Sequence, residues 1–197
     1  MHEPVPSLRV VVCEDEGLTV LRLRRALEAL GHQVVGEARD GEEAIRLAAA
    51  LRPDVMLMDV RMPRLDGITA ARQIMSTTPT AIVMVTAFSD RELVDSAVEA
   101  GASSYLVKPV SDDQLAPAIA LAHHRFRQFQ QLGSEVDDLK EALEVRKLVE
   151  RAKGVLMDRL GLNEAEAFRR LQGTSRDRRQ SLGETAKQII DAAQLLG

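Results

Sequence analysis

The chain has 197 residues, of which 45% are apolar and 28% are charged, with a formal net charge of −4 and one cysteine. This length exceeds the roughly 100 to 150 residues of a usual domain, so we expect one full domain and a smaller second unit. The composition excludes a disordered chain, no apolar run approaches the ~18 residues of a membrane span, and the first residues lack a secretory signal. We therefore expect a cytoplasmic protein without disulfides, in which Cys13 is a buried, inert thiol.

From residue 8 to about 124, short β-branched runs alternate with helical periods. The predicted strands are 8–13, 33–37, 54–58, 81–85 and 104–107, and the predicted helices are 17–30, 41–51, 67–75, 90–100 and 112 to about 129. Strict alternation implies right-handed crossovers and a parallel sheet covered by helices on both faces. In such α/β folds the functional site lies at the carboxyl ends of the strands.

Local helix signals agree with this assignment. Capping boxes are predicted at three helix starts, and two glycines fall just beyond helix ends, where a left-handed residue is favoured. The pairs are Asp40 with Glu43, Ser89 with Glu92 and Ser111 with Gln114, and the glycines are Gly31 and Gly101.

After the fifth helix no further strand pattern occurs, and a short heptad seam begins. Its apolar members recur at spacings of three and four: Phe129, Leu132, Val136, Leu139 and Leu143. Such a seam favours a dimeric coiled coil, and the alternative is a single amphipathic helix packed on its own domain.

The last segment, 146–197, predicts three helices: a continuation to about Arg159, a second from Asn163 to about Leu171, and a third from roughly Arg178 to Leu196. Gly161 ends the first helix, and Asn163 with Glu166 forms a capping box for the second. This segment has eleven basic and seven acidic residues, a net charge of +4, so the first 145 residues carry −8. The basic segment is the better candidate for contact with a polyanion, although a charged helix face is often merely solvated.

Polar residues follow four of the predicted strands at one edge of the sheet. They are Glu14 and Asp15 after the first strand, Asp59 at the end of the third, Thr86 after the fourth and Lys108 after the fifth. Three clustered carboxylates repel one another unless a cation joins them, and hard oxygen ligands suit Mg²⁺. Such a pocket allows a carboxylate to attack phosphorus, with Lys108 and the Thr86 hydroxyl contacting the phosphoryl oxygens. Taken singly, each residue also has a structural explanation, such as an acidic helix start.

The joint pattern resembles the receiver domain of bacterial response regulators over about residues 8–124. The matching motifs are Val11 to Glu16, Met58 to Pro63 with Asp66-Gly67, Val85 to Ala87, and Gly101-Ala102 leading to Tyr105 to Pro109. The resemblance implies a flavodoxin-like fold and Asp59 as phosphoacceptor from a sensor histidine kinase. It further implies Mg²⁺ ligands at Asp15, Asp59 and the Arg61 backbone carbonyl, with Glu14 acting partly through water. Thr86 and Tyr105 would form the switch pair, Lys108 would contact the phosphoryl group, and the Lys108-Pro109 bond would be cis.

The segment Arg146 to Met157, followed by Leu162 to Leu171, resembles the ANTAR output domain over about residues 129–193. This resemblance implies a small all-α three-helix unit that dimerises through the preceding coiled coil, binds RNA stem-loops and controls transcription termination. The candidate RNA-facing residues are Lys147, Arg151, Lys153, Arg170, Arg178 and Arg179. Phe168, the only aromatic residue of the segment, is expected to pack in the core. The stretch 172–176 departs from the family pattern, because Gly, Thr and Ser weaken a helix and Arg176 stands where an apolar residue is common.

The expected organisation is a receiver domain at 8–124, a coiled-coil linker helix at 125–145 and an ANTAR-like domain at 146–197. The expected function is a phosphorylation-dependent response regulator that dimerises on activation and acts by RNA binding and transcription antitermination. It is expected not to be an enzyme beyond its own Mg²⁺-dependent phosphorylation and dephosphorylation. Two alternatives are a receiver-controlled protein-binding adaptor and a phosphatase-type hydrolase; the latter is disfavoured because no second Asp lies two residues after Asp59.

Overall fold

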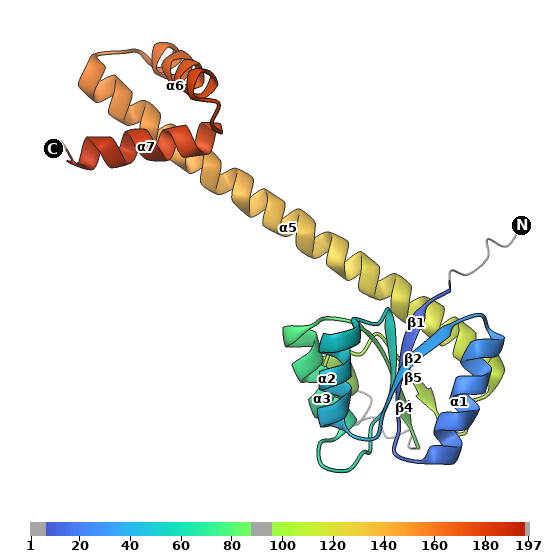
Figure 1. Cartoon of the computed structure of the whole chain (residues 1–197). Helices are drawn as coiled ribbons and strands as arrows, with labels where there is room; N and C mark the ends of the chain where they lie inside the picture. Colours follow the sequence, from blue (N-terminus) through green and yellow to red (C-terminus); the bar gives the residue numbers. More distant parts are fainter. Residues whose placement is uncertain (1–6, 88–95, 196–197) are drawn as a thin grey trace, which may run out of the picture. The chain divides into compact units, whose positions relative to one another are not determined.

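The computed structural model describes residues 7–87 and 96–195, which form two compact units, Met1–Gln130 and Gln131–Gly197. The first unit contains a five-stranded sheet and its covering helices (Figure 1). Its elements are β1 (Arg9–Cys13), α1 (Gly17–Ala29), β2 (Gln33–Ala38), α2 (Gly41–Leu51), β3 (Val55–Asp59), α3 (Gly67–Thr77), β4 (Ala81–Thr86), β5 (Ser104–Val107) and the start of α5 (Asp112–Leu160). Most of the predicted helix 90–100, together with the Ser89 and Glu92 pair, lies outside the described residues.

All strand pairings are parallel and the strand order is β2-β1-β3-β4-β5, which is the flavodoxin-like doubly wound arrangement. The predicted α/β class and its five strands are confirmed. Strand ends differ from the prediction by one or two residues; β3, for example, begins at Val55 and includes Asp59.

Two apolar layers hold the helices on the two faces of the sheet. Alternate residues of β1, β3 and β4 face α1 and the first turns of α5, where Leu115 and Ile119 are buried. The other residues of these strands face α2 and α3, with Ile74 at the centre. Because the central strands are covered on both sides, they have no polar face, and Cys13 is buried among them as predicted.

The predicted helix signals are present in part among residues 7–87 and 96–195, because the two predicted capping boxes there each form only one of their two side-chain hydrogen bonds. The Asp40 side chain accepts a hydrogen bond from the Glu43 N–H at 2.8 Å, and Gly31 and Gly101 have φ values of 85° and 90°. The Ser111 N–H donates to Gln114 Oε1 at 3.3 Å. These contacts satisfy backbone groups that the helix ends leave without partners.

Helix α5 corrects one prediction, because it does not end near Phe129 but continues to Leu160. The five heptad residues lie within it and are exposed by between 48% and 70%. These exposures favour the coiled-coil prediction over packing of the seam on its own domain. Among the helices of residues 7–87 and 96–195, none combines the length and the apolarity needed to cross a membrane.

The second unit packs the last turns of α5 against α6 (Glu164–Arg178) and α7 (Leu182–Leu195). Its core consists of Val149, Ala152, Leu156, Ala167, Leu171, Ala186 and Ile190. The predicted capping box of Asn163 and Glu166 is present, and Gly161, with φ of 66°, follows the end of α5. The predicted three-helix organisation is thus observed.

The boundaries of α6 and α7 differ from the prediction. Helix α6 runs through the weak stretch 172–176 to Arg178, where Thr174 Oγ1 donates to the Arg170 carbonyl at 2.9 Å. Burial of Leu171 anchors the preceding turn, so tertiary packing outweighs the low helix propensity. Helix α7 begins at Leu182 rather than near Arg178, because Ser181 and Glu184 form a reciprocal cap there.

Candidate functional site

Three carboxylates meet at the carboxyl edge of the sheet. Glu14 and Asp15 directly follow β1, and Asp59 is the last residue of β3, the neighbouring strand. One oxygen from each of these side chains lies within 4.8 Å of the others. Glu14 and Asp59 are buried and Asp15 is exposed, so the cluster opens to solvent on one side. The predicted convergence of these residues is observed.

Lys108 brings a positive charge into the cluster from the residue after β5. Its Nζ donates to Glu14 Oε2 at 2.6 Å and to Asp59 Oδ2 at 2.7 Å. Burial, together with the nearby Asp59 charge, raises the pKa of Glu14, and the Lys108 hydrogen bond opposes this rise. Although burial alone would lower it, the bonds to Asp59 and Glu14 raise the pKa of Lys108. A charged lysine therefore offsets part of the negative charge of the two buried carboxylates.

The backbone around Asp59 is held closely. The Arg61 N–H donates to Asp59 Oδ1 at 3.2 Å, and the Gly67 N–H donates to the Val60 carbonyl at 3.0 Å. A Cβ added to Gly67 would lie 1.9 Å from the Asp59 carbonyl oxygen, so only glycine fits at the start of α3. This contact fixes the end of β3 against the first turn of α3.

The remaining predicted residues lie on β4 and β5. Thr86 is buried at the end of β4, and its carbonyl accepts from the Lys108 N–H at 2.7 Å. Tyr105 on β5 is 49% exposed. The Lys108-Pro109 bond is cis, as the resemblance implied.

One contact beside this cluster was missed in the sequence, where Asp40 was assigned only as a helix cap. The Asp40 side chain is fully buried and also pairs with Arg64, from the loop that follows Asp59. Arg64 has a left-handed backbone, with φ of 63°. The ion pair ties the β2–α2 loop to the β3–α3 loop, and no local sequence signal indicates it because the partners are 24 residues apart.

The donor set of the carboxylate cluster fits a hard divalent cation. It offers oxygen atoms from three side chains, two of them buried, and the described residues place no sulfur or imidazole ligand in the cluster. Mg²⁺ prefers such oxygen ligands and keeps several waters, for which the exposed side at Asp15 leaves room.

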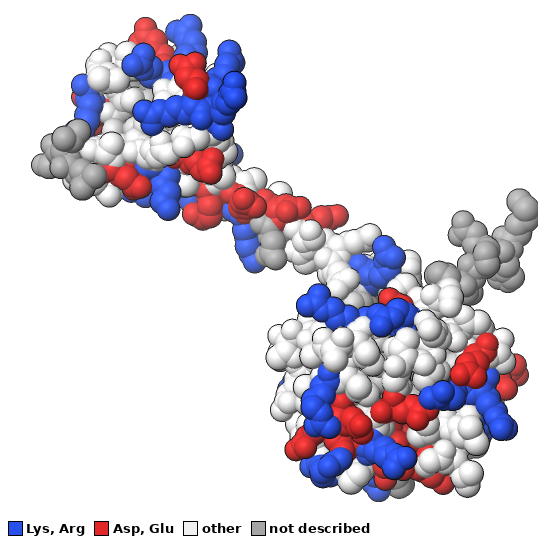
Figure 2. Space-filling model, viewed as in Figure 1, with Lys and Arg blue, Asp and Glu red and all other residues white. Residues whose placement is uncertain are grey.

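Most of the predicted RNA-facing cations lie on the surface of the second unit. Lys147, Arg151, Arg170, Arg178 and Arg179 are exposed. Lys147 pairs with Glu144, and Arg178 donates to Gln188 Oε1. Figure 2 shows basic side chains gathered around α6. Arg169 and Arg176 are also exposed on this helix; they were not among the predicted residues, and Arg176 does not occupy a packing position.

The structure corrects the prediction that Lys153 faces RNA. Its side chain is only 9% exposed, and Nζ bonds to Glu150 at 2.9 Å and to Glu164 at 2.7 Å. These hydrogen bonds and charges raise the pKa of Lys153. The ammonium group is already paired inside the unit, so Lys153 connects α5 to the start of α6 instead of facing a ligand.

The structure also corrects the predicted position of Phe168. It was expected to pack in the core, yet it is 36% exposed and is absent from the apolar cluster of the second unit. The core positions of α6 are Ala167 and Leu171, spaced by four residues. A side chain adjacent to Ala167 points about 100° away from that buried face, which places the ring at the surface.

Fold and site together define a receiver-type signalling domain joined to a helical output unit. Comparison with known families gives the same division: the response regulator receiver domain matches residues 10–120, and the ANTAR domain matches residues 137–190. The chain therefore belongs to the response regulators, and it carries a receiver followed by an output domain of the RNA-binding ANTAR type.

Individual relatives cover either most of the chain or a little more than half of it. The transcriptional regulatory protein PdtaR of Mycobacterium tuberculosis H37Rv is 48% identical over 183 residues, which is 93% of this chain and 89% of that protein. Protein CcdB of Bacillus subtilis is 37% identical over 113 residues, or 57% of this chain and 94% of CcdB.

Solved structures match the receiver. The response regulator domain of Thermotoga maritima CheB has a TM-score of 0.54 at 33% identity and covers 62% of this chain and 96% of that one. A chain of the CheX-CheY-BeF3-Mg²⁺ complex from Borrelia burgdorferi has a TM-score of 0.55 at 27% identity. The match covers 58% of this chain and 87% of that one.

Proposed function

We propose that Asp59 accepts a phosphoryl group from a sensor histidine kinase and that this modification controls RNA binding and transcription antitermination by the second unit. The observation that carries the proposal is the bridge from Lys108 to both Asp59 and Glu14, beside Asp15, at the carboxyl edge of a receiver sheet. This arrangement offers a nucleophilic carboxylate, a fixed cation and oxygen ligands in one pocket.

The chemical step follows from these positions. An Asp59 carboxylate oxygen attacks phosphorus and forms an acyl phosphate, while the bond from phosphorus to the donor nitrogen or oxygen breaks. Lys108 moves from the carboxylate to a phosphoryl oxygen, and Thr86 donates its hydroxyl to another. Asp15, Asp59 and the Arg61 carbonyl would hold Mg²⁺, with Glu14 acting partly through water, and the ion would supply charge that offsets the incoming phosphoryl group. The BeF3 and Mg²⁺ named with the Borrelia CheY structure support this assignment.

The switch we propose connects this pocket to the sheet surface. Thr86, buried at the end of β4, turns toward the phosphoryl group, and Tyr105, half exposed on β5, moves toward the space that Thr86 leaves. The exposed surface of β5 changes as a result.

RNA contact is assigned to the exposed cations of the second unit. Lys147, Arg151, Arg170, Arg178 and Arg179 would neutralise phosphates, and Arg169 and Arg176 join them on α6. Phe168 offers an exposed ring on which an unpaired loop base of a stem-loop can stack. The transcriptional role of PdtaR supports an output of this kind.

The heptad seam is assigned to a second copy of this chain. Its five apolar residues are exposed at coiled-coil spacing, and flanking charges such as Glu135 and Lys140 keep the rest of the helix polar. We place the receiver at 8–124, the linker at 125–145 and the output domain at 146–197, with dimerisation following activation.

The deciding experiment treats the full chain and Asp59→Asn with acetyl phosphate and Mg²⁺, then measures intact mass and binding to a tandem-hairpin RNA. We expect one added phosphoryl group on the parent and none on the variant. RNA affinity should rise with phosphorylation and fall with salt concentration. Absence of salt-dependent binding in either state would refute the RNA assignment. Nuclease-resistant recovery of a protein partner would instead favour the adaptor.

A further inference from the structure

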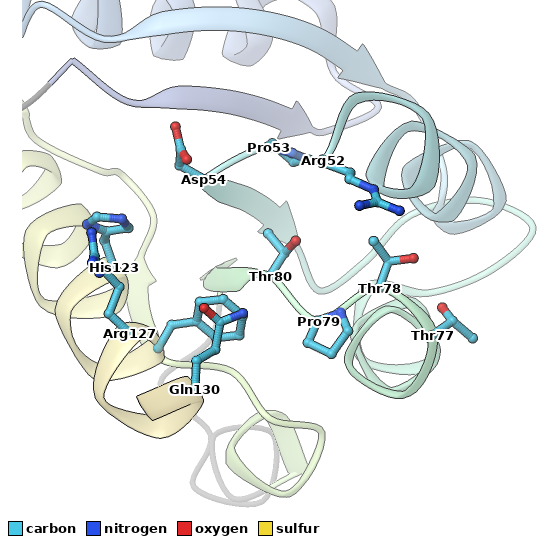
Figure 3. A pocket seen from close by; sticks show the side chains of 11 residues that line it. Arg52, Pro53, Asp54, Thr77, Thr78, Pro79, Thr80, His123, Arg127 and Gln130 are labelled. Atoms are coloured by element: carbon cyan, nitrogen blue, oxygen red, sulfur yellow. The ribbon is translucent and has the colours of Figure 1, made fainter. Parts of the chain in front are cut away.

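The edge of the receiver sheet opposite Asp59 contains a polar cavity of about 570 Å³. It lies where β3 and β4 begin, and its walls come from the α2–β3 loop, the α3–β4 loop and α5 (Figure 3). This volume lies within the range of about 300 to 1,000 Å³ that small-molecule sites occupy. Neither phosphoryl transfer at Asp59 nor RNA binding uses these residues.

Two arginines and a histidine line this cavity. Arg52 lies on the loop side, and His123 and Arg127 come from α5 on the other side (Figure 3). Within the described chain, none of these three side chains makes a hydrogen bond or an ion pair to another residue. A guanidinium group offers five donors in a fixed fork that matches phosphate oxygens, so two of them on facing walls favour an anionic guest.

The negative groups nearby already have partners inside the chain. Asp54 Oδ2 accepts from the Arg9 N–H at 2.7 Å, and the Arg52 carbonyl, at the end of α2, accepts from Arg9 Nη1 at 3.1 Å. The Arg9 guanidinium thus offsets the partial negative charge of the α2 carboxyl end, whereas the Arg9 N–H satisfies one Asp54 oxygen without neutralising its charge, so the lining holds two arginines against one carboxylate. The carboxyl end of α3 contributes only a partial negative charge, whereas Arg52 and Arg127 each contribute a full positive charge.

Neutral donors and an apolar wall complete the cavity. The Thr78 and Thr80 hydroxyls line it without a hydrogen-bond partner among the described residues, and Thr80 is almost fully buried. The Phe126 ring and Pro79 add apolar surface. A site with a few convergent donors around an apolar wall is typical of organic ligands carrying an anionic group.

We propose that this cavity binds a small phosphorylated metabolite, whose phosphate groups contact Arg52 and Arg127 and whose organic part lies against Phe126 and Pro79. Such a ligand would join α5 to the two loops at the amino edge of the sheet. It would act as a second input to the receiver, separate from the phosphoacceptor.

The test is calorimetric titration of the full chain with ADP as the probe, in EDTA so that the acidic cluster holds no Mg²⁺. We expect saturable binding that weakens roughly tenfold or more in Arg52→Gln and in Arg127→Gln, since each removes a charge-assisted hydrogen bond. Adenosine, which lacks the phosphates, should bind at least about tenfold more weakly than ADP. Amide chemical shifts should change mainly at residues 52–54, 77–80 and 123–130.

Two matched variants locate the site. Arg46→Gln removes an exposed cation of α2 outside the cavity, and Arg170→Gln removes one from the basic surface of the second unit. Both should retain the parent affinity for ADP. No saturable binding, or weakening by Arg170→Gln without weakening by the two cavity variants, would overturn the proposal while leaving the role of Asp59 untouched. Melting followed by circular dichroism, which reports on both units, confirms that each variant is folded.

Discussion

The Nζ atom of Lys108 lies 2.7 Å from Oδ2 of Asp59, so a cation placed after β5 reaches across β4 to the carboxylate that ends β3. The same Nζ atom is 2.6 Å from Glu14, beyond Asp59 on the far side of the cluster. One side chain thus connects three strands at the edge where phosphoryl transfer is proposed.

Replacing this cation should slow phosphorylation of Asp59. In Lys108→Ala we expect the rate with acetyl phosphate and Mg²⁺ to fall roughly a hundredfold or more, because a fixed donor no longer stabilises charge on the phosphoryl group. Intact-mass time courses give the rate. Lys187→Ala, which removes an exposed lysine of α7, serves as the control. Equal rates in Lys108→Ala and the parent would contradict the assigned role.

The stability of the receiver should fall in mild acid because of His32. Burial lowers the pKa of His32, whose Nδ1 accepts from the Leu8 N–H at 3.3 Å. Below the unfolded pKa of about 6.5 the unfolded chain binds a proton that the folded chain resists, so stability drops by at most about 1.4 kcal/mol per pH unit.

Melting between pH 7.5 and 5.5, followed through Tyr105, measures this effect, because the only tyrosine lies in the receiver and the chain has no tryptophan. His32→Asn keeps an acceptor but cannot titrate, so its melting temperature should depend less on pH. His124→Asn, at an exposed position of α5, should behave like the parent. An unchanged pH dependence in His32→Asn would exclude this histidine as the source.

Lys153 and Arg151 lie two residues apart on α5, and we expect Lys153 to support stability and Arg151 to support RNA binding. Lys153→Met breaks one ion pair within α5, to Glu150, and one that joins α5 to α6, to Glu164, so we expect a lower melting temperature of the second unit by circular dichroism. Arg151→Met should leave melting unchanged and weaken hairpin binding, with a smaller dependence on salt. If Lys153→Met retained full stability and lost RNA affinity, Lys153 would contact RNA, as the sequence predicted.

Removal of the Phe168 ring should weaken RNA binding without unfolding the second unit. Base stacking on an aromatic side chain contributes about 1 to 3 kcal/mol, so Phe168→Ala should raise the hairpin Kd by roughly 5- to 150-fold. Leu160→Ala, at another exposed apolar position, tests for a general loss of apolar surface. Fluorescence anisotropy supplies the Kd values, and parent-like affinity in Phe168→Ala would rule out stacking.

Charge placed in the heptad seam should prevent self-association. Leu139 is 70% exposed at the middle of the seam, and Leu139→Asp would bury a carboxylate between two copies. Sedimentation of the phosphorylated protein should show dimers for the parent and monomers for this variant. Ser134→Asp, on the opposite side of the helix, should remain dimeric. Dimers of Leu139→Asp would place the interface elsewhere.

The receiver fold and its acidic site followed from the sequence because both depend on periodic patterns. Apolar runs of five or six residues predict strands buried on two faces, and parallel strands bring their carboxyl ends to one edge. Residues as distant as Glu14 and Lys108 could therefore be placed together without any contact information. Strand ends were less accurate, since Asp59 continues β3 although its side chain is charged.

The second unit was harder to predict because its surface depends on how three helices meet. Lys153 and Arg151 look alike in sequence, and only the position of Glu164 on α6 decides which is paired. For Phe168 a signal was present: Ala167 and Leu171 have the spacing of a core face, which leaves the ring outside it. The ion pair of Asp40 and Arg64 had no such signal.

At Gly67 the first turn of α3 meets the Asp59 carbonyl through bare backbone, with no side chain between them. Changes in the volume of neighbouring core residues can be absorbed by other side chains, but this junction has nothing that can adjust. The backbone at the end of β3 therefore keeps a fixed distance from the first turn of α3. Because Gly67 has a hydrogen atom in place of a Cβ, the backbone of α3 can lie directly against Asp59, the residue on which the proposed chemistry of the pocket depends.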